Sequence, residues 1–307
     1  MSRALVLSGG SVKGAFQAGA VAEVLESGYK PTAIYGTSVG SLNGAFLAER
    51  AGRLPPSQVE SAWPSIGAEL EEFWRLEITS FARIGRRRCI LRLAWDILTN
   101  RFNGLVDTRA LRALVGRVID ADNLRRSPVA FSACTVNIAD GAAVYAGAGD
   151  ADILEYIMAS AAIPVTMPLS RIGRQPHLDG GIREIAPLKR AIEEGADEIV
   201  CIVCQPAQIR GAAFNPAKLL DLVQRVIDII TNELVNDDLR RFNRINEELA
   251  ALQDTPSTGP LAGKRFIPIT VIRPDVAIDL DLEKFTAAQI DNAIAAGRTV
   301  ARRLLRD

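Results

Sequence analysis

Two short apolar runs near the N-terminus each end in a glycine-containing turn, and each precedes a helix-like stretch. Residues 3–7 and 32–35 resemble buried strands, and residues 15–26 and 42–49 resemble the helices that follow them. Such alternation predicts an α/β domain around a largely parallel sheet. Further strands are expected over residues 129–135, 142–145, 198–204 and 266–272, and further helices over residues 152–161, 187–195 and 283–305. Residues 216–252 predict one long amphipathic helix or two.

The overall composition is that of an ordinary globular protein. Of 307 residues, 48% are hydrophobic and 23% are charged, which argues against disorder and allows a single domain over residues 1–307. Basic and acidic residues balance at 36 each, so no net charge attracts nucleic acid. No apolar run reaches the roughly 18–20 residues of a membrane span, and the N-terminal run is too short for a signal peptide. We therefore expect a cytoplasmic protein.

The second glycine-containing turn, residues 36–40, reads G-T-S-V-G and fits the pattern G-x-S-x-G. In this pattern a sharp strand-to-helix turn exposes a serine hydroxyl, and small flanking residues are needed because the backbone is strained and tightly packed. Gly36 and Gly40 meet that need. A purely structural turn is the alternative. The strand before the turn and the helix after it favour Ser38 as a nucleophile.

The first turn, residues 8–14, reads S-G-G-S-V-K-G and is called the glycine loop below. It departs from the dinucleotide-binding fingerprint because Ser11 occupies the place of the second glycine, and from the P-loop because Lys13 precedes Gly14. A loop whose N–H groups stabilise an oxyanion, aided by the positive end of the next helix, is a third possibility. A plain tight turn is the fourth.

A serine nucleophile needs a base, and His177 is the one histidine of the chain. Asp179 follows it two places later, at the end of a short strand and directly before Gly180 and Gly181. A carboxylate that is hydrogen-bonded to a serine hydroxyl can accept its proton in a dry setting. The alternatives are an ordinary Asp-Gly turn and a histidine on a half-exposed strand face. We favour Asp179 as the base.

Two of the four cysteines, Cys201 and Cys204, form a C-x-x-C pattern within a strand-like run. Residues three apart on a strand point to opposite faces, so we expect two separate buried thiols. No second pair of Cys or His residues completes a metal site.

Taken in order, the glycine loop, G-T-S-V-G and D-G-G resemble the motifs of the patatin-like phospholipase family. Residues 159–164 (A-S-A-A-I-P) and 195–200 (G-A-D-E-I-V) are also similar to family segments, so the resemblance covers residues 4–204. It implies a three-layer α/β/α sandwich with a helical insertion after the nucleophile helix. It also implies a lipid or acyl-ester substrate, a Ser-Asp dyad and no metal or cofactor. Carried across, Ser38 is the nucleophile, Asp179 the general base, and Gly9, Gly10 and Ser11 the oxyanion hole, supported by Gly14, Gly36, Gly40, Gly180 and Gly181. Ser11 departs from the glycine usual in the family, which costs on the order of 1 kcal/mol if its φ is positive.

Residues 54–106 are expected to form a helical insertion or lid, and residues 213–307 the C-terminal helices and last strand. Within the insertion, the stretch from Arg83 to Arg101 holds six arginines, one aspartate, Trp95 and several aliphatic residues. Such a stretch is typical of an element that contacts a membrane surface peripherally, and equally of a packed helix with solvated arginines. Two other functions fit the same motifs: hydrolysis or acyl transfer on soluble esters and thioesters, and lipid binding without turnover.

Overall fold

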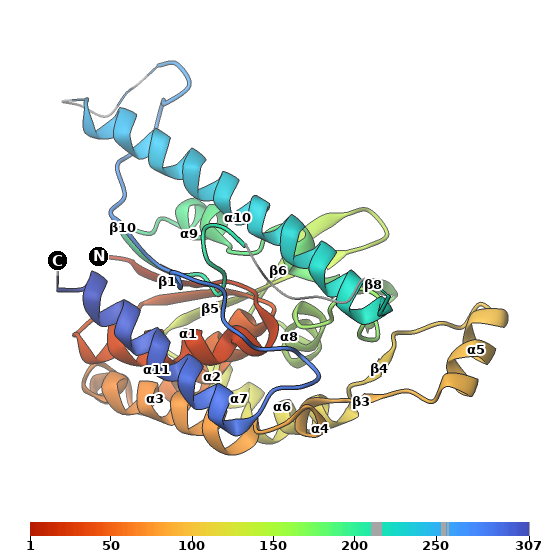
Figure 1. The fold of residues 1–307 in the computed structure, drawn as a ribbon. Coiled ribbons are helices and arrows are strands. Elements are labelled where there is room, and N and C mark those ends of the chain that lie inside the picture. The colour runs from red at the N-terminus through yellow and green to blue at the C-terminus, as the bar shows by residue number, and fades with distance from the viewer. Residues whose placement is uncertain (210–216, 253–255, 257, 307) are drawn as a thin grey trace.

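The computed structural model describes residues 1–209, 217–252, 256 and 258–306 (Figure 1). Within these residues the central sheet has eight strands, in the order β10-β9-β1-β2-β5-β8-β7, with β6 paired to β5. The strands are β1 (Arg3–Leu7), β2 (Ala33–Thr37), β5 (Ala130–Asn137), β6 (Ala142–Gly147), β7 (Ser170–Ile172), β8 (Gln175–Asp179), β9 (Glu198–Ile202) and β10 (Ile269–Ile272). β10, β9, β1, β2 and β5 run parallel, and β6, β7 and β8 are antiparallel to their neighbours.

Helices cover both faces of the sheet (Figure 1). One face carries α1 (Gly14–Glu26), α2 (Val39–Gly52), α3 (Pro56–Glu77), α6 (Arg109–Val118), α7 (Ala121–Arg126), α8 (Ile153–Ser160) and α11 (Ala287–Leu304), and the other α9 (Leu188–Glu193) and α10 (Leu219–Ala250). Because side chains alternate along a strand, Leu5 and Leu7 join the hydrophobic cluster on the first face, whereas Ala4 and Val6 join the cluster on the second. The chain is therefore a three-layer α/β/α sandwich with a mostly parallel sheet, as predicted.

The ends of several elements differ from the sequence-based expectation. Within the described part of residues 216–252, the chain forms a single helix, α10, and not two. The last helix begins at Ala287 instead of residue 283, because Thr286 and Gln289 form a capping box at its start. β9 ends at Ile202, two residues earlier than expected, and β10 begins at Ile269.

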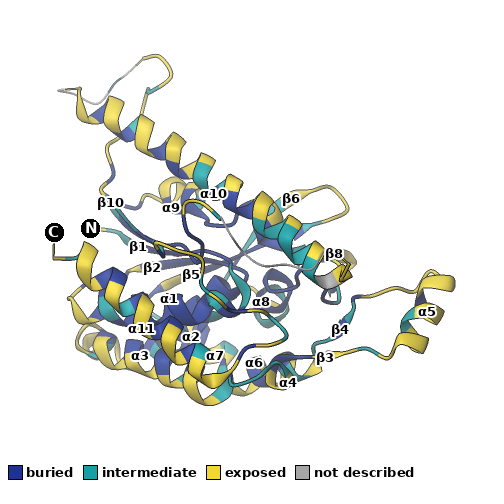
Figure 2. Cartoon of the chain, in the orientation of Figure 1, coloured by how far each residue is buried: buried dark blue, intermediate teal, exposed yellow. Residues whose placement is uncertain are grey.

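The expected helical insertion, residues 54–106, divides into two parts. α3 belongs to the core layer, because its Trp63 and Trp74 are buried against α1 and α2. The rest projects from the body as an arm (residues 85–107), built from a ribbon of β3 (Arg86–Arg87) and β4 (Val106–Asp107) with α5 (Ile90–Leu98) at its tip (Figures 1 and 2). The short helix α4 (Phe81–Ile84) leads into the arm.

Cys201, Cys204 and His177 are all buried in the fold. Cys201 and Cys204 are unpaired, lie in the clusters on opposite faces of the sheet, and have thiol pKa values that burial raises to about 12. His177 is buried, not half-exposed as expected, because Thr135 and Tyr156 cover its ring, with 3.1 Å between its Nδ1 and the Thr135 hydroxyl oxygen. Burial lowers its pKa.

Candidate active site

Ser38 lies at the sharp turn between β2 and α2, with φ 56° and ψ −127°, a backbone conformation that non-glycine residues rarely adopt. The turn is tight on both sides. A Cβ atom at Gly36 would lie 2.3 Å from the carbonyl oxygen of Gly40, and one at Gly40 would lie 2.1 Å from that of Leu7. The G-x-S-x-G spacing is thus a packing requirement, and within this turn the backbone strain falls on Ser38, which lines a pocket.

Ser160 holds this strained turn in place. Its hydroxyl accepts a hydrogen bond from the Ser38 N–H at 2.8 Å and donates one to the Cys134 carbonyl at 2.6 Å, so it joins the turn to β5. Sequence reasoning used Ser160 only as part of the A-S-A-A-I-P segment and missed this contact. The position of Ser160 in that segment was the one feature of the sequence that could have pointed to this role.

Strand register brings Asp179 to the level of Ser38. Thr37 of β2 pairs with Cys134 of β5, and the next residue of β5, Thr135, pairs with Asp179 of β8. β8 runs antiparallel to β5, so Asp179 does not lie at the carboxyl end of a parallel strand. Asp179 reaches the carboxyl edge of the parallel strands because β5 extends beyond the end of β2 and β8 pairs with that extension.

The Asp179 carboxylate is held in a dry environment. It accepts a hydrogen bond from the Gly181 N–H at 2.7 Å, and both Asp179 and Ser38 are buried. Burial raises the pKa of Asp179 to about 6, against the side-chain hydrogen bond with Ser38 and the bond from Gly181, which lower it. Gly180 is needed nearby, because a Cβ there would lie 2.4 Å from the Cys134 carbonyl oxygen. A carboxylate with this pKa is ionised at neutral pH and basic enough to accept a proton.

The glycine loop faces the same site, but its three predicted oxyanion donors are not equivalent. Gly9 already donates its N–H to the Ile185 carbonyl at 2.9 Å. Across the described parts of the chain, the N–H groups of Gly10 and Ser11 have no such partner. Of the three predicted donors, Gly9 is therefore already engaged, and Gly10 and Ser11 have no backbone partner among the described residues.

Ser11 has a φ of 53°, so the condition under which serine is costly there is met. We expect Ser11→Gly to raise the free energy of unfolding by about 1 kcal/mol, because glycine adopts positive φ without steric conflict. Urea denaturation measures the change. Ser65→Gly, on the exposed side of α3, is the matched control and should lower stability instead. Equal changes in both variants would contradict this account of Ser11.

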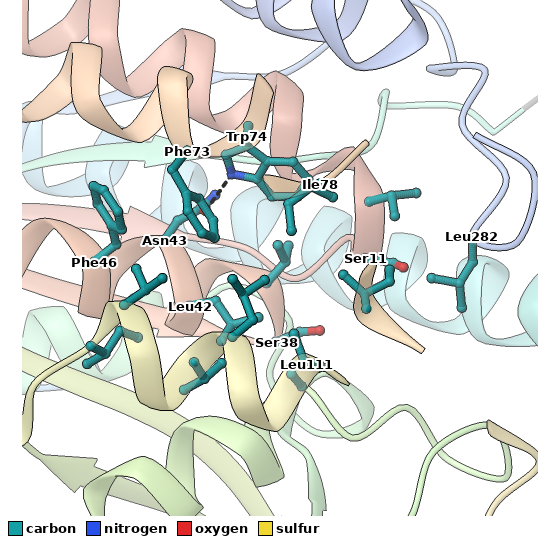
Figure 3. A pocket seen from close by; sticks show the side chains of 18 of the residues that line it. Ser11, Ser38, Leu42, Asn43, Phe46, Phe73, Trp74, Ile78, Leu111 and Leu282 are labelled. Carbon is teal, nitrogen blue, oxygen red and sulfur yellow. Dashed lines mark hydrogen bonds between the residues drawn. The ribbon is translucent and has the colours of Figure 1, made fainter. Parts of the chain in front are cut away.

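Two pockets of opposite character meet at Ser38. The first contains about 750 Å³ of empty space, counting its open mouth, and runs between α2, α3 and α6 (Figure 3). Its lining is apolar apart from Ser11, Ser38 and Asn43, and the Asn43 amide is occupied by Trp74, Gly14 and Gln17. The second pocket is smaller and more polar and contains both Ser38 and Asp179. A buried serine between an apolar pocket and a polar one suits an ester with an apolar acyl part.

Helix α10 supplies the outer wall of the polar pocket, which the sequence did not reveal. Gln224, Asp228 and Thr231 line it, and the Lys13 ammonium lies 3.4 Å from the Asp228 carboxylate, which ties the glycine loop to α10. The amphipathic pattern predicted the helix, but which loop its polar residues would meet depends on tertiary packing.

Glu184 is a second buried carboxyl that sequence reasoning missed. Its carboxylate accepts a hydrogen bond from the Tyr145 hydroxyl, and its carbonyl accepts one from the Thr37 hydroxyl at 3.0 Å. Burial, with the nearby charge of Asp238, raises its pKa to about 7. Glu184 lines neither of the two pockets at Ser38. Its contact with Thr37 stabilises the end of β2 instead.

A family model described as patatin-like phospholipase matches residues 5–192. Among solved structures, VipD from Legionella pneumophila is similar with 13% identity and a TM-score of 0.43, over 99% of this chain and 67% of that one. The type III effector protein ExoU is similar with 14% identity and a TM-score of 0.36, over 99% of this chain and 53% of that one. A search of curated proteins gave no match.

Proposed function

Because this chain belongs to the patatin-like phospholipase family, a family of lipid acyl hydrolases, we propose that it hydrolyses lipid esters with Ser38 as nucleophile and Asp179 as general base. One observation carries the assignment. A serine on a strained turn and a buried carboxylate, whose pKa the serine lowers, line one small pocket, and the same serine also lines the larger apolar pocket. No helix among the described residues is long and apolar enough to cross a membrane.

The first step forms an acyl-enzyme. Ser38 Oγ attacks the ester carbonyl carbon while Asp179 accepts the hydroxyl proton, and the carbonyl oxygen becomes an oxyanion. The N–H groups of Gly10 and Ser11, which have no backbone partner among the described residues, stabilise this charge. Collapse of the intermediate breaks the ester C–O bond, and the proton on Asp179 passes to the departing alcohol.

The second step releases the fatty acid. A water molecule attacks the acyl-enzyme carbonyl while Asp179 accepts its proton, and the second tetrahedral intermediate collapses with return of that proton to Ser38 Oγ. The balance is one water consumed and one ester converted into an acid and an alcohol. The apolar pocket holds the acyl chain, and the polar pocket beside α10 receives the alcohol.

The test combines fluorophosphonate labelling of the full chain with fatty-acid release from phospholipid vesicles. Labelling mapped to Ser38 by mass spectrometry, together with release, supports the proposal. Labelling with turnover of short soluble esters alone would favour a soluble acyl substrate instead. Vesicle binding without labelling or release would overturn hydrolysis in favour of a lipid-binding protein.

We also propose that the arm contacts the membrane surface. The α5 helix reverses the usual arrangement, because its one buried residue is Asp96, which pairs with Arg88 and Arg92, while most of its aliphatic residues face solvent. Ile90, Leu91 and Leu98 are each at least 80% exposed, and Trp95 is 60% exposed (Figure 2). An apolar helix tip above an arginine-rich base suits insertion into an anionic lipid surface.

Replacing Leu91 and Leu98 together by aspartate should weaken binding to anionic vesicles at least tenfold, because each leucine contributes about 1.5 kcal/mol or more when it enters an apolar phase. Vesicle co-sedimentation measures the binding. Leu76→Asp, at an exposed leucine of α3 outside the arm, is the matched control and should bind like the wild type. Unchanged binding of the double variant would exclude α5 as the contact.

A further inference from the structure

The apolar pocket runs along α2, the helix that forms its floor. Ser38 precedes α2, and Leu42 and Phe46 follow at intervals of four residues, so all three lie along one side of the helix and line the pocket. Figure 3 shows Ser38 toward the Ser11 end and Phe46 at the opposite end. Eight residues of helix advance about 12 Å, which sets the distance along the pocket from the nucleophile to Phe46.

Phe46 closes the far end, and its ring is held firmly. The ring centroid lies 5.3 Å from that of Phe73 on α3, and the Arg50 guanidinium carbon lies over the ring, 4.1 Å from its centroid. The Arg50 guanidinium in turn donates hydrogen bonds to the Glu69 carboxylate at 2.9 Å and to the Val118 carbonyl oxygen at 3.2 Å.

Beyond Phe46 the surroundings become charged. Arg50 also pairs with Glu49, whose carboxylate is fully buried. A hydrocarbon chain that passed the Phe46 ring would have to displace the Arg50 guanidinium from Glu49, and charged groups that lose partners in a buried setting are costly. The path along α2 therefore ends at Phe46.

From this geometry we infer that Phe46 sets the length of the acyl chain that the site accepts; the inference rests on the proposed function. Each carbon of an extended chain advances somewhat less than its bond length of about 1.5 Å, so about 12 Å holds about ten carbons. The site selects medium-length acyl chains over long ones. The specificity belongs to the acyl side of the ester and is independent of the alcohol.

The experiment compares kcat/KM of the full chain on p-nitrophenyl esters from butanoate to palmitate. Each methylene that the pocket buries should raise kcat/KM about fourfold, until the chain end reaches Phe46, where the increase stops or reverses. Phe46→Leu moves the optimum to longer esters. Leu42→Phe, which fills the middle of the pocket, moves it to shorter ones. Phe16→Leu is the matched control, because Phe16 is buried on the same face of the sheet but does not line the pocket.

Opposite shifts in Phe46→Leu and Leu42→Phe, with the wild-type profile in Phe16→Leu, support the inference. Thermal melting shows which variants are folded, and Leu42→Phe tests the same idea if Phe46→Leu does not fold. An unchanged profile in either folded pocket variant, in an enzyme that labels at Ser38 and hydrolyses short esters, overturns the inference and leaves the proposed function intact. A wild type that hydrolyses no ester overturns both.

Discussion

Ser38→Ala is expected to abolish fluorophosphonate labelling and to reduce fatty-acid release at least about 10³-fold, because alanine cannot form the acyl-enzyme. Residual turnover, if any, would come from water attacking an ester held in the apolar pocket against the Gly10 and Ser11 N–H groups. Intact-protein mass spectrometry measures the labelling, and titration of released fatty acid measures the turnover.

The same position provides its own control for folding. Ser38→Gly also lacks the hydroxyl but is free of the strain at φ 56°, so it should be more stable than Ser38→Ala by about 1 kcal/mol and equally inactive. Equal inactivity at different stability would separate loss of the nucleophile from loss of the fold. Labelling that survives in either variant would place the nucleophile elsewhere.

Asp179→Asn is expected to lower kcat about 10³-fold or more while it leaves the fold intact, because an amide cannot accept the Ser38 proton but can still accept the Gly181 N–H bond. In the wild type the base must be ionised. With its pKa raised by burial to about 6, kcat/KM should fall about tenfold per pH unit below pH 6 and level off above it. A pH profile from 4.5 to 8 measures this.

Glu184→Gln is the matched control, because it removes another buried carboxyl whose pKa, near 7, lies in the same range. It should leave the acid limb near pH 6 in place. A limb that disappears in Glu184→Gln would assign the titration to Glu184 and contradict the role of Asp179.

The same pKa predicts a conflict between activity and stability at Asp179. Its pKa in the folded chain, about 6, lies above the ordinary value of 3.8, so the folded state holds the proton more tightly. Stability therefore falls as pH rises from about 4 to about 6, and the loss is complete above that. Asp179→Asn removes a cost of up to about 3 kcal/mol at pH 7 and should unfold at a higher urea concentration than the wild type.

Local motifs were enough to predict the two strand–turn–helix units, an α/β domain and the pair of residues proposed as a dyad, while the family resemblance implied the three-layer fold. The G-x-S-x-G turn can be recognised from the sequence because its strain and close packing restrict the flanking positions to glycine. This restriction is local to the turn. The family resemblance over residues 4–204 has the same origin, since it depends on short segments whose chemistry is local.

The surroundings of those residues were decided by packing between distant segments. Asp179 lies beside Ser38 because β5 extends beyond the end of β2 and β8 pairs with that extension. This strand register is not encoded by any residue of the D-G-G motif. The Gly9 N–H is engaged because the Ile185 carbonyl lies beside it, and part of the apolar pocket is formed because Phe73 of α3 packs against Phe46 of α2. Sequence patterns report the conformations that neighbouring residues allow, whereas pocket shape, burial and the pKa of a carboxyl depend on which remote side chains exclude water from it.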